Sequence, residues 1–350
     1  MDEELGFSFD IEYLENQKLF LDQGEGGPEE VVVWVESRDD IRLWQKVLRD
    51  SNSYIYIFRP ATMFRSPDGK AANGCGRLIK LWRTGEIQGG KNSIFCLDSD
   101  YRYIASLSGE YSGEDYKFPN FYWTVIHSKE HVFIHDAVVD ELVSHIACMP
   151  KGRLEQRAAE VHGWISKVIY SPFLRLLYAQ SCCFESPSIA VQKFSERLDF
   201  LLSSLLEKNQ GVFEREGCAI WAGFIEGASQ LANDLEEYLA TEAPLDGLFR
   251  FQQKLTEVGV TEGNIYLFYR GHDWYNLCFR IAKSYLDSLH CERLAEIKAT
   301  SKDVGRDIKE FRNQTPSIND AFLSVIPKVE DIPFFVDTVR MLRREYPESF

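Results

Sequence analysis

The chain has 350 residues and a mass of 40.4 kDa, and 45% of its residues are hydrophobic, which is enough for at least one full core and predicts two domains. Its 54 acidic and 39 basic residues give a net charge of −15, which argues against a protein that coats nucleic acid through a broad basic face. No apolar stretch reaches the roughly 18 residues that cross a bilayer, and the N-terminus is acidic where a signal peptide would be basic. We therefore expect a cytoplasmic protein with no membrane partner.

The eight cysteines show no CxxC pair, and several lie inside apolar segments. Their spacing does not suit a zinc site, and a cytoplasmic chain keeps its thiols reduced. We therefore expect buried free thiols.

Residues 1–28 form an acidic leader that ends in a cluster of glycines and a proline. The uninterrupted apolar run Val31–Val35 then predicts a strand that is covered on both faces, as in a parallel sheet. In the segment 38–49, Ile41, Trp44 and Val47 recur at helical spacing, which predicts an amphipathic helix.

Two further strand–helix units follow. Tyr54–Phe58 predicts the second strand, and it leads through the Gly-rich stretch 66–76 to a helical pattern over 77–82. Ser93–Leu97 predicts the third strand, and a polar loop over 106–116 leads to a fourth over 121–126. The sequence thus predicts an α/β domain with a parallel sheet over residues 29–135.

From residue 136 onward the pattern becomes helical, so we expect a mainly helical domain over 136–350. The predicted helices cover 136–148, 154–170, 189–207, 219–239, 276–289 and 334–344. One apolar run in this half, Ile265–Tyr269, predicts a strand-like segment.

Acidic residues follow two of the predicted strands directly. Glu36 ends the first apolar run, and Asp98 and Asp100 follow the third. Ligands of open α/β sheets bind beyond the carboxyl ends of the strands, and alternate residues of an extended chain share a face. We therefore expect Glu36, Asp98 and Asp100 to converge on Mg²⁺, or Mn²⁺, because a hard divalent cation relieves the repulsion between carboxylates.

The chain resembles the TOPRIM fold of topoisomerases, primases and related nucleases, which carries a strand-terminal Glu and a later Asp-x-Asp. More narrowly, it is similar to the TOPRIM-like family of unknown function that includes the effector of the PARIS anti-phage system. The segments that support the resemblance are VESRDD around Glu36, Gly74–Arg77, LDSD around Asp98, His127–His131 and Arg270–Asp273.

The resemblance implies a magnesium-dependent nuclease in antiviral defence, with Asp98 and Asp100 as metal ligands and Glu36 as a ligand or general acid/base. Hydrolysis is the simplest chemistry for this chain, because it lacks the additional domains of a topoisomerase or primase. Water would then be the nucleophile. The resemblance further implies a partner ATPase that silences this toxin until infection, and a cellular RNA as substrate, with transfer RNA as one candidate. The resemblance is also compatible with a homodimer.

Other interpretations stay open. Glu36 could be an acid that stabilises the N-terminus of the following helix, and Asp98 and Asp100 could belong to a solvated turn. At the level of function, the chain could be a non-catalytic interaction subunit that binds metal or nucleotide, or it could hydrolyse phosphate monoesters or nucleotides on the same metal site.

Several further features have a structural interpretation. The Gly-rich stretch lacks both common phosphate-binding patterns, which favours an ordinary turn. His127, His131 and His135 recur every fourth residue, but the β-formers between them favour capping or surface histidines. The basic residues of the helical half could form a local phosphate track, although solvated helix faces explain most of them. The roles of Glu130 and of Arg270–Asp273 remain open.

Overall fold

The computed structural model describes residues 27–63, 74–111, 114–184, 188–205, 213, 218–242, 245–324 and 328–348. Most of the predicted acidic leader and most of the Gly-rich stretch lie outside these residues. The chain divides into two compact units that alternate along the sequence. Unit 1 holds the described residues of Met1–Leu97, Phe118–Tyr122 and Val339–Phe350, and unit 2 holds those of Asp98–Lys117 and Trp123–Thr338.

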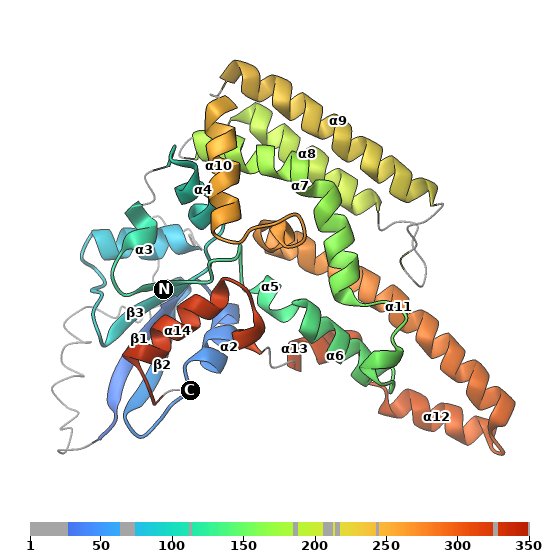
Figure 1. Ribbon diagram of the computed structural model, residues 1–350. Coiled ribbons are helices and arrows are strands. Elements are labelled where there is room, and N and C mark those ends of the chain that lie inside the picture. Colours follow the sequence, from blue (N-terminus) through green and yellow to red (C-terminus); the bar gives the residue numbers. More distant parts are fainter. Residues whose placement is uncertain are drawn as a thin grey trace, which may run out of the picture. The chain divides into compact units, whose positions relative to one another are not determined.

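A four-stranded sheet has the order β2-β1-β3-β4. Its strands are β1 (Glu29–Val35), β2 (Tyr54–Pro60), β3 (Ser93–Leu97) and β4 (Phe121–Trp123). β1 pairs in parallel with β2 over its whole length and with β3 from Val32 to Trp34, which confirms the predicted parallel pairing. Figure 1 shows these three strands side by side. The fourth strand ends at Trp123, three residues earlier than predicted.

The helices of unit 1 form where the sequence predicted them. α2 (Arg38–Val47) packs on β1 and β2 through buried Leu43 and Trp44, and α3 (Cys75–Arg83) packs on β1. The end of α14 (Phe335–Glu345) contributes Glu345, which accepts a hydrogen bond of 2.5 Å from the Tyr122 hydroxyl. Successive residues of β1 are buried, so both faces of this strand are covered, as the continuous apolar run predicted.

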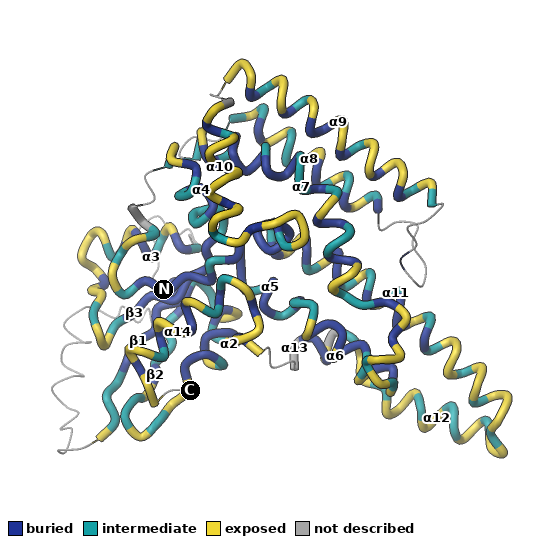
Figure 2. Tube along the Cα trace, in the orientation of Figure 1, coloured by how far each residue is buried: buried dark blue, intermediate teal, exposed yellow. Residues whose placement is uncertain are grey.

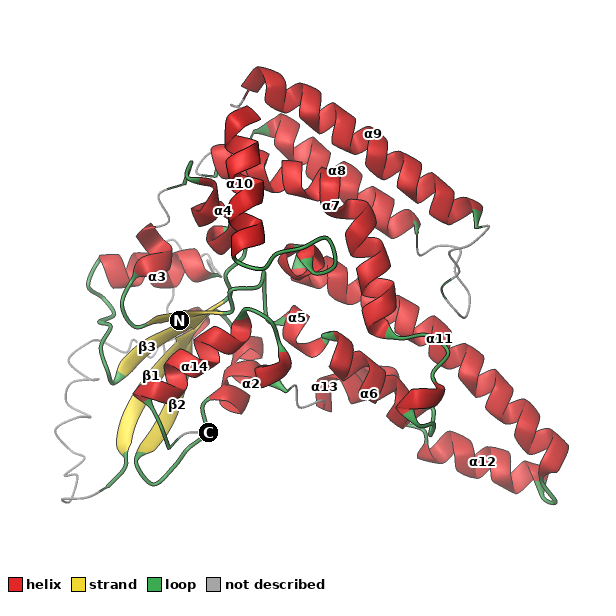
Figure 3. Ribbon diagram, in the orientation of Figure 1, coloured by secondary structure: helices red, strands yellow, loops and turns green. Residues whose placement is uncertain are grey.

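Unit 2 is helical, so the chain is an α/β protein with a helical region (Figure 3). Its helices are α4 (Arg102–Ser108), α5 (Glu130–Phe133), α6 (Asp136–Ile146), α7 (Ala158–Cys182), α8 (Ile189–Ser204), α9 (Ala219–Glu242), α10 (Leu245–Glu257), α11 (Gly271–Thr300), α12 (Val304–Gln314) and α13 (Ile318–Ser324). α7 packs against α4, α6, α8 and α9, and α11 packs against α5, α6 and α12. Figure 2 shows the contrast between the buried parts of α7 and the largely exposed α12.

The strand-like segment predicted at Ile265–Tyr269 is wrong. Ile265–Phe268 forms a 3₁₀ helix, η4, and all four of its residues are buried. A short apolar run does not distinguish a strand from another buried segment, because burial alone accounts for the run. The predicted loop over 106–116 likewise contains the end of α4 and a second 3₁₀ helix, Glu114–Lys117.

The eight cysteines are free, and their burial is mixed. Cys75, Cys96 and Cys278 are buried as predicted, whereas Cys148, Cys182 and Cys291 are exposed, so the prediction is wrong for these three. Cys182 and Cys291 lie on helices, where an apolar neighbourhood in the sequence also includes residues on the solvent side, and Cys148 lies in the turn that follows α6. Among the helices in the described ranges, none combines the length and apolarity of a membrane span.

Candidate active site at the end of the sheet

The first two acidic candidates follow neighbouring strands of the sheet. β1 ends at Val35 and β3 ends at Leu97, so Glu36 and Asp98 are the residues directly beyond these ends. Because β1 and β3 run parallel, both strands have their carboxyl ends at the same edge. This edge is where open α/β sheets bind their ligands.

Glu36 is half-buried in unit 1 and lies near the start of α3. A Cβ atom added at Gly74 would lie 3.8 Å from the Glu36 Oε2 atom, so this glycine brings the backbone close to the carboxylate. Asp40 caps α2, since its Oδ2 atom accepts hydrogen bonds of 2.6 Å from the Ser37 amide and from the Ser37 hydroxyl. The helix-capping role that Glu36 could have filled therefore belongs to Asp40.

Asp98 is buried at the start of unit 2, with 8% of its surface exposed. Its Oδ1 atom accepts a hydrogen bond of 2.9 Å from the Lys129 amide, and its Oδ2 atom lies 3.9 Å from the Lys129 ammonium. A hydrogen bond fixes the carboxylate on one side, while a cation faces it on the other. A solvated turn, which was the alternative interpretation of Asp98, does not account for this burial.

Asp100 adopts a different conformation from the one that the sequence suggested. Its φ of 45° places it in the left-handed region, so the chain is not extended here and the expected strand alternation is wrong. Its amide donates to the His127 carbonyl at 2.8 Å, and its carboxylate pairs with Arg102 at 3.2 Å. The two aspartates therefore have different cationic partners, Lys129 for Asp98 and Arg102 for Asp100.

A second carboxylate, from Glu130, faces the same lysine. Its Oε1 atom lies 3.8 Å from the Lys129 ammonium and 3.5 Å from the His272 imidazole. Burial raises the pKa of Glu130, but the positive charge of Lys129 contributes most to outweighing it, so the pKa is lowered and Glu130 is ionised. We call Asp98, Lys129 and Glu130 the strand-end group.

The first turn of α11 packs directly on this group. A Cβ atom at Gly271 would lie 1.8 Å from the Ser128 hydroxyl oxygen and 2.8 Å from the Glu130 Oε2 atom, distances that no side chain tolerates. Gly271 thus allows the N-terminus of a 30-residue helix to approach the Glu130 carboxylate, where the helix dipole favours a negative charge.

The histidines beside the group are mostly buried, which corrects the expectation of surface residues for His127 and His131. Burial lowers the pKa of His127 well below its ordinary value, and it lowers the pKa of His131 to about 4. The Nε2 atom of His131 donates to the Tyr269 carbonyl at 2.8 Å. His135 occupies the N-cap position of α6, but its side chain makes no capping hydrogen bond there.

Lys129 is the residue that sequence reasoning missed. Its ammonium, with 15% of the side chain exposed, lies between two carboxylates at distances longer than a hydrogen bond. These two contacts are therefore electrostatic. The carboxylates of the strand-end group attract a cation. The only signal in the sequence is the run Ser128–Glu130, in which a lysine precedes an acid.

The donor chemistry of the group fits a hard divalent cation, because Asp98 and Glu130 offer carboxylate oxygens to the same point of positive charge. Within the described ranges, no three or more His, Cys, Asp or Glu side chains form a cluster that could hold a metal by themselves. Any ion here would therefore complete its coordination with water or with a substrate oxygen.

No protein-family model matches this chain, and the curated proteins contain no match to it.

Proposed function

We propose that this protein is a metal-dependent phosphodiester hydrolase of the TOPRIM-like class, with Asp98 as its principal metal ligand. The observation that supports it best is a buried carboxylate directly beyond the end of β3, which faces an ammonium together with Glu130. A buried carboxylate at the carboxyl end of a strand is costly unless cations and hydrogen bonds compensate its charge, and buried charged groups of this kind cluster at functional sites.

Asp98 and Asp100 would hold the metal, with Glu36 as a further ligand or general acid/base. Bound magnesium would neutralise a phosphate oxygen and lower the pKa of an attacking water. Asp98 is oriented for this task by the Lys129 amide, which fixes one of its oxygens. Glu130, ionised beside Lys129, could accept a proton from water, and the Lys129 ammonium could contact a phosphate oxygen of the substrate.

The net charge of −15 has to be overcome locally for a nucleic-acid substrate to bind. Arg102 and Lys129 supply positive charge beside the candidate ligands, and Arg270 stands immediately before α11, where it pairs with Asp199 and Asp273. The resemblance of the sequence adds the finer part of the proposal: an anti-phage effector that a partner ATPase holds silent and that cleaves RNA, transfer RNA included.

The test is cleavage of transfer RNA, single-stranded RNA and duplex DNA by the full chain in magnesium, in manganese and in chelator. Wild type is compared with Asp98→Asn, Asp100→Asn and Glu36→Gln. Asp39→Asn is the matched control, because this exposed acid lies in the first turn of α2, close to Glu36 in the sequence. The proposal predicts metal-dependent cleavage that all three site variants lose and the control retains.

Two outcomes would replace the proposal. Magnesium binding that depends on Asp98, without cleavage of any substrate even when the chain is expressed with its partner ATPase, would identify a non-catalytic interaction subunit. Hydrolysis of mononucleotides or phosphate monoesters, with oligonucleotides left intact, would identify a phosphatase on the same ligands.

A further inference from the structure

Unit 2 contains a cavity of about 140 Å³ between α8 and α11. An engineered protein cavity of about 150 Å³ binds one benzene molecule, so this volume suits a single organic ring. The residues that line the cavity include Asp199, Leu202 and Ser203 on α8 and Asp273, Leu277 and Arg280 on α11. We call this space the α8–α11 cavity.

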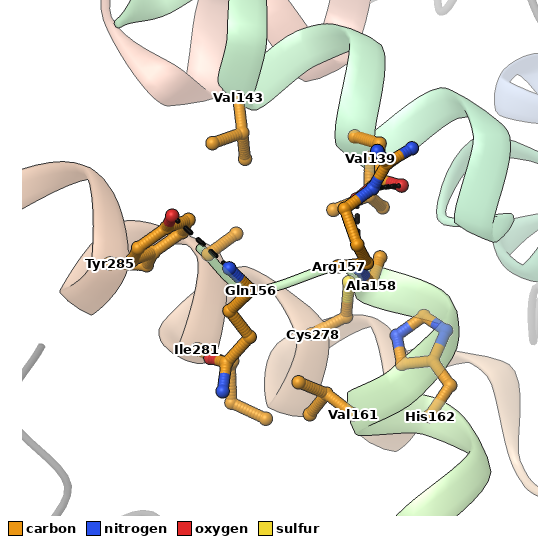
Figure 4. Close-up of a pocket in the computed structure, with 12 residues that line it drawn as sticks. Val139, Val143, Gln156, Arg157, Ala158, Val161, His162, Cys278, Ile281 and Tyr285 are labelled. Atoms are coloured by element: carbon orange, nitrogen blue, oxygen red, sulfur yellow. Dashed lines mark hydrogen bonds and ion pairs between the residues drawn. The ribbon is translucent and has the colours of Figure 1, made fainter. Parts of the chain in front are cut away.

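A second cavity, at the junction of α6, α7 and α11, differs in both size and lining. It has a volume of about 30 Å³, and valines 139, 143 and 161 form much of its apolar wall (Figure 4). A space of this size holds a molecule not much larger than water. Of these two cavities, the α8–α11 cavity is therefore the one that admits an organic ligand.

One face of α11 forms a wall of the α8–α11 cavity and has different polar groups at its two ends. Asp273, Leu277 and Arg280 follow one another at spacings of four and three residues, so they lie along one stripe of the helix. At about 1.5 Å per residue, this stripe is about 10 Å long. Leu277 is buried in the middle, between the acid and the arginine. A ligand along this stripe therefore meets an acceptor, an apolar surface and a donor.

Asp273 can accept hydrogen bonds from a ligand. Its Oδ2 atom pairs with the Arg270 Nε atom at 2.8 Å, but a carboxylate has about four lone-pair sites, and 46% of this side chain is exposed. Asp199 is more fully engaged, since it accepts hydrogen bonds from both the Tyr269 hydroxyl and Arg270. Asp273 is therefore the acid of the cavity that is available to the N–H groups of a ligand.

Two donors of the cavity wall have no acceptor in the part of the chain that the structure describes. Arg280 is exposed, and its side chain forms no ion pair or hydrogen bond with the described residues. Trp274 is buried, and its Nε1 atom has no hydrogen-bond partner among them. Buried donors in native proteins are satisfied by protein, water or ligand, so this wall calls for acceptor atoms in the cavity.

The cavity and the strand-end group meet at the first turn of α11. The His272 Nδ1 atom lies 3.5 Å from the Glu130 Oε1 atom, and the next residue, Asp273, lines the cavity. A nucleic-acid strand with a phosphate at the strand-end group can therefore extend a base into the cavity. A nucleobase suits this lining, because its faces are apolar and its edges carry hydrogen-bonding groups.

We propose that the α8–α11 cavity binds an unpaired guanine of an RNA strand. Guanine is the base that presents two adjacent N–H donors, at N1 and at the 2-amino group, and these suit the two oxygens of Asp273. Arg280 donates to O6 and N7 of the base, as arginine does in other contacts with guanine. The ring packs on Leu202 and Leu277, which are both buried. The choice of RNA rests on the proposed function, which places a phosphate at the strand-end group.

The first experiment titrates the full chain with nucleosides by isothermal titration calorimetry, in chelator, so that no metal site contributes. Guanosine is compared with inosine, which lacks only the 2-amino group, and with adenosine, cytidine and uridine. We expect guanosine to bind at least about tenfold more tightly than inosine, because inosine offers Asp273 one donor in place of two. Equal affinities, or no binding of guanosine, would overturn the proposal.

Two variants assign the binding to this cavity. Asp273→Asn should lower the affinity for guanosine at least about tenfold, whereas Asp287→Asn, which alters an exposed acid of the same helix, should not. Ser203→Trp places an indole in the cavity from α8 and should abolish binding of every nucleoside, with the exposed Ser229→Trp on α9 as its control. Guanosine binding that Ser203→Trp retains would contradict the proposal.

A second experiment distinguishes a base of RNA from a free nucleoside. Fluorescence anisotropy in chelator compares labelled oligouridine with the same strand that carries one central guanine, which should bind several-fold more tightly. Equal binding of the two strands would refute the RNA part of the proposal. Guanosine binding without cleavage in any metal would refute the hydrolase but not the cavity, whereas cleavage that neither guanine nor Asp273→Asn affects would refute the cavity alone.

Discussion

The strand-end group and the Asp136–His162 pair, in which the first residue of α6 meets a histidine of α7, both join an acid to a cation, but they hold the cation differently. Lys129 lies 3.8 and 3.9 Å from its two carboxylates, whereas the His162 and Asp136 side chains share a hydrogen bond of 2.6 Å. Long ionic contacts attract a charge without fixing its position through a hydrogen bond. A short hydrogen bond fixes the positions of its donor and acceptor atoms. The first arrangement suits ligand binding, and the second suits an ion pair that stabilises the fold.

The largest effect that this comparison predicts is at Asp98. Asp98→Asn keeps an oxygen that can accept the Lys129 amide but removes the charge that would bind a metal, so cleavage should fall below detection while the melting temperature changes by a few degrees at most. Cleavage assays beside thermal melts measure both quantities. Loss of activity together with a collapse of the melting temperature would show that Asp98 is structural.

At the Asp136–His162 pair, removal of the acid should affect folding instead. Asp136→Ala leaves the buried His162 cation without its carboxylate, and such a loss costs about 3–5 kcal/mol of unfolding free energy. Asp234→Ala is the control, because its partner Arg197 has a side chain that is 45% exposed and such pairs contribute at most about 1 kcal/mol. Urea unfolding measures both values. Equal losses in the two variants would mean that the pair is not tightly coupled.

Two buried histidines sharpen the comparison, because their environments give them different charge states, protonated for His162 and neutral for His131. His162 faces a carboxylate and is protonated, whereas His131 donates to the Tyr269 carbonyl and has a pKa lowered to about 4 by burial. The unfolded chain takes up a proton at His131 near pH 6.5, before the folded chain does. Stability should therefore fall as the pH decreases from about 6.5 towards about 4.

The charged and titratable groups that act on His131 are Glu130, His135 and His162. His131→Gln keeps a donor for the Tyr269 carbonyl and cannot titrate. Between about pH 6.5 and about pH 4, its unfolding free energy should therefore decrease by up to about 3 kcal/mol less than that of wild type. Urea unfolding at several pH values tests this, with the exposed His145→Gln as the control. Because burial also lowers the pKa of His127, the His131→Gln variant should keep part of the pH dependence of stability.

The sequence predicted what depends on local pattern and missed what depends on tertiary packing. The apolar run before Asp98 was enough to predict β3 and the acid at its end, because strand length and burial are both visible in a continuous run. The left-handed turn at Asp100 was not, since aspartate occurs in both conformations. Whether Glu36 joins the same site stays a prediction that its Gln variant tests.

Lys129 and the Asp136–His162 pair escaped for a different reason. The hydrogen bond of the Lys129 amide joins residues 31 positions apart, and the hydrogen bond between Asp136 and His162 joins α6 to α7. No periodic pattern encodes such contacts, because each helix shows only that a given side chain faces inward. The carboxylate beside His162 became visible only with the packing of α7 on α6.

Gly271 links the strand-end group to the helical region, and its replacement should have an intermediate effect. The Cβ atom of Gly271→Ala would meet the Ser128 hydroxyl at 1.8 Å, so either the Ser128 and Glu130 side chains or the start of α11 must move, at a cost of about 1–3 kcal/mol. Gly223→Ala in α9 meets no atom within 4 Å and should stabilise the protein by about 0.5–1 kcal/mol. Opposite changes in melting temperature would confirm this close approach, and similar changes would contradict it.

The smallest effect is expected at Lys129, and it is the most direct test of whether the cation there can be exchanged. Lys129→Met keeps the length of the side chain but removes the ammonium, which leaves the charges of Asp98 and Glu130 without their shared cation. In chelator the variant should melt at a lower temperature than wild type, because the two carboxylates then repel each other. Magnesium should raise its melting temperature more than it raises that of wild type, and calorimetric titration should show affinity that is several-fold tighter, because no lysine competes with the ion. Lys167→Met, which alters an exposed lysine on α7, is the control and should respond to magnesium as wild type does. If Lys129→Met and wild type bind magnesium equally, the ion does not replace the ammonium, and the strand-end group is a fixed ion pair of the fold.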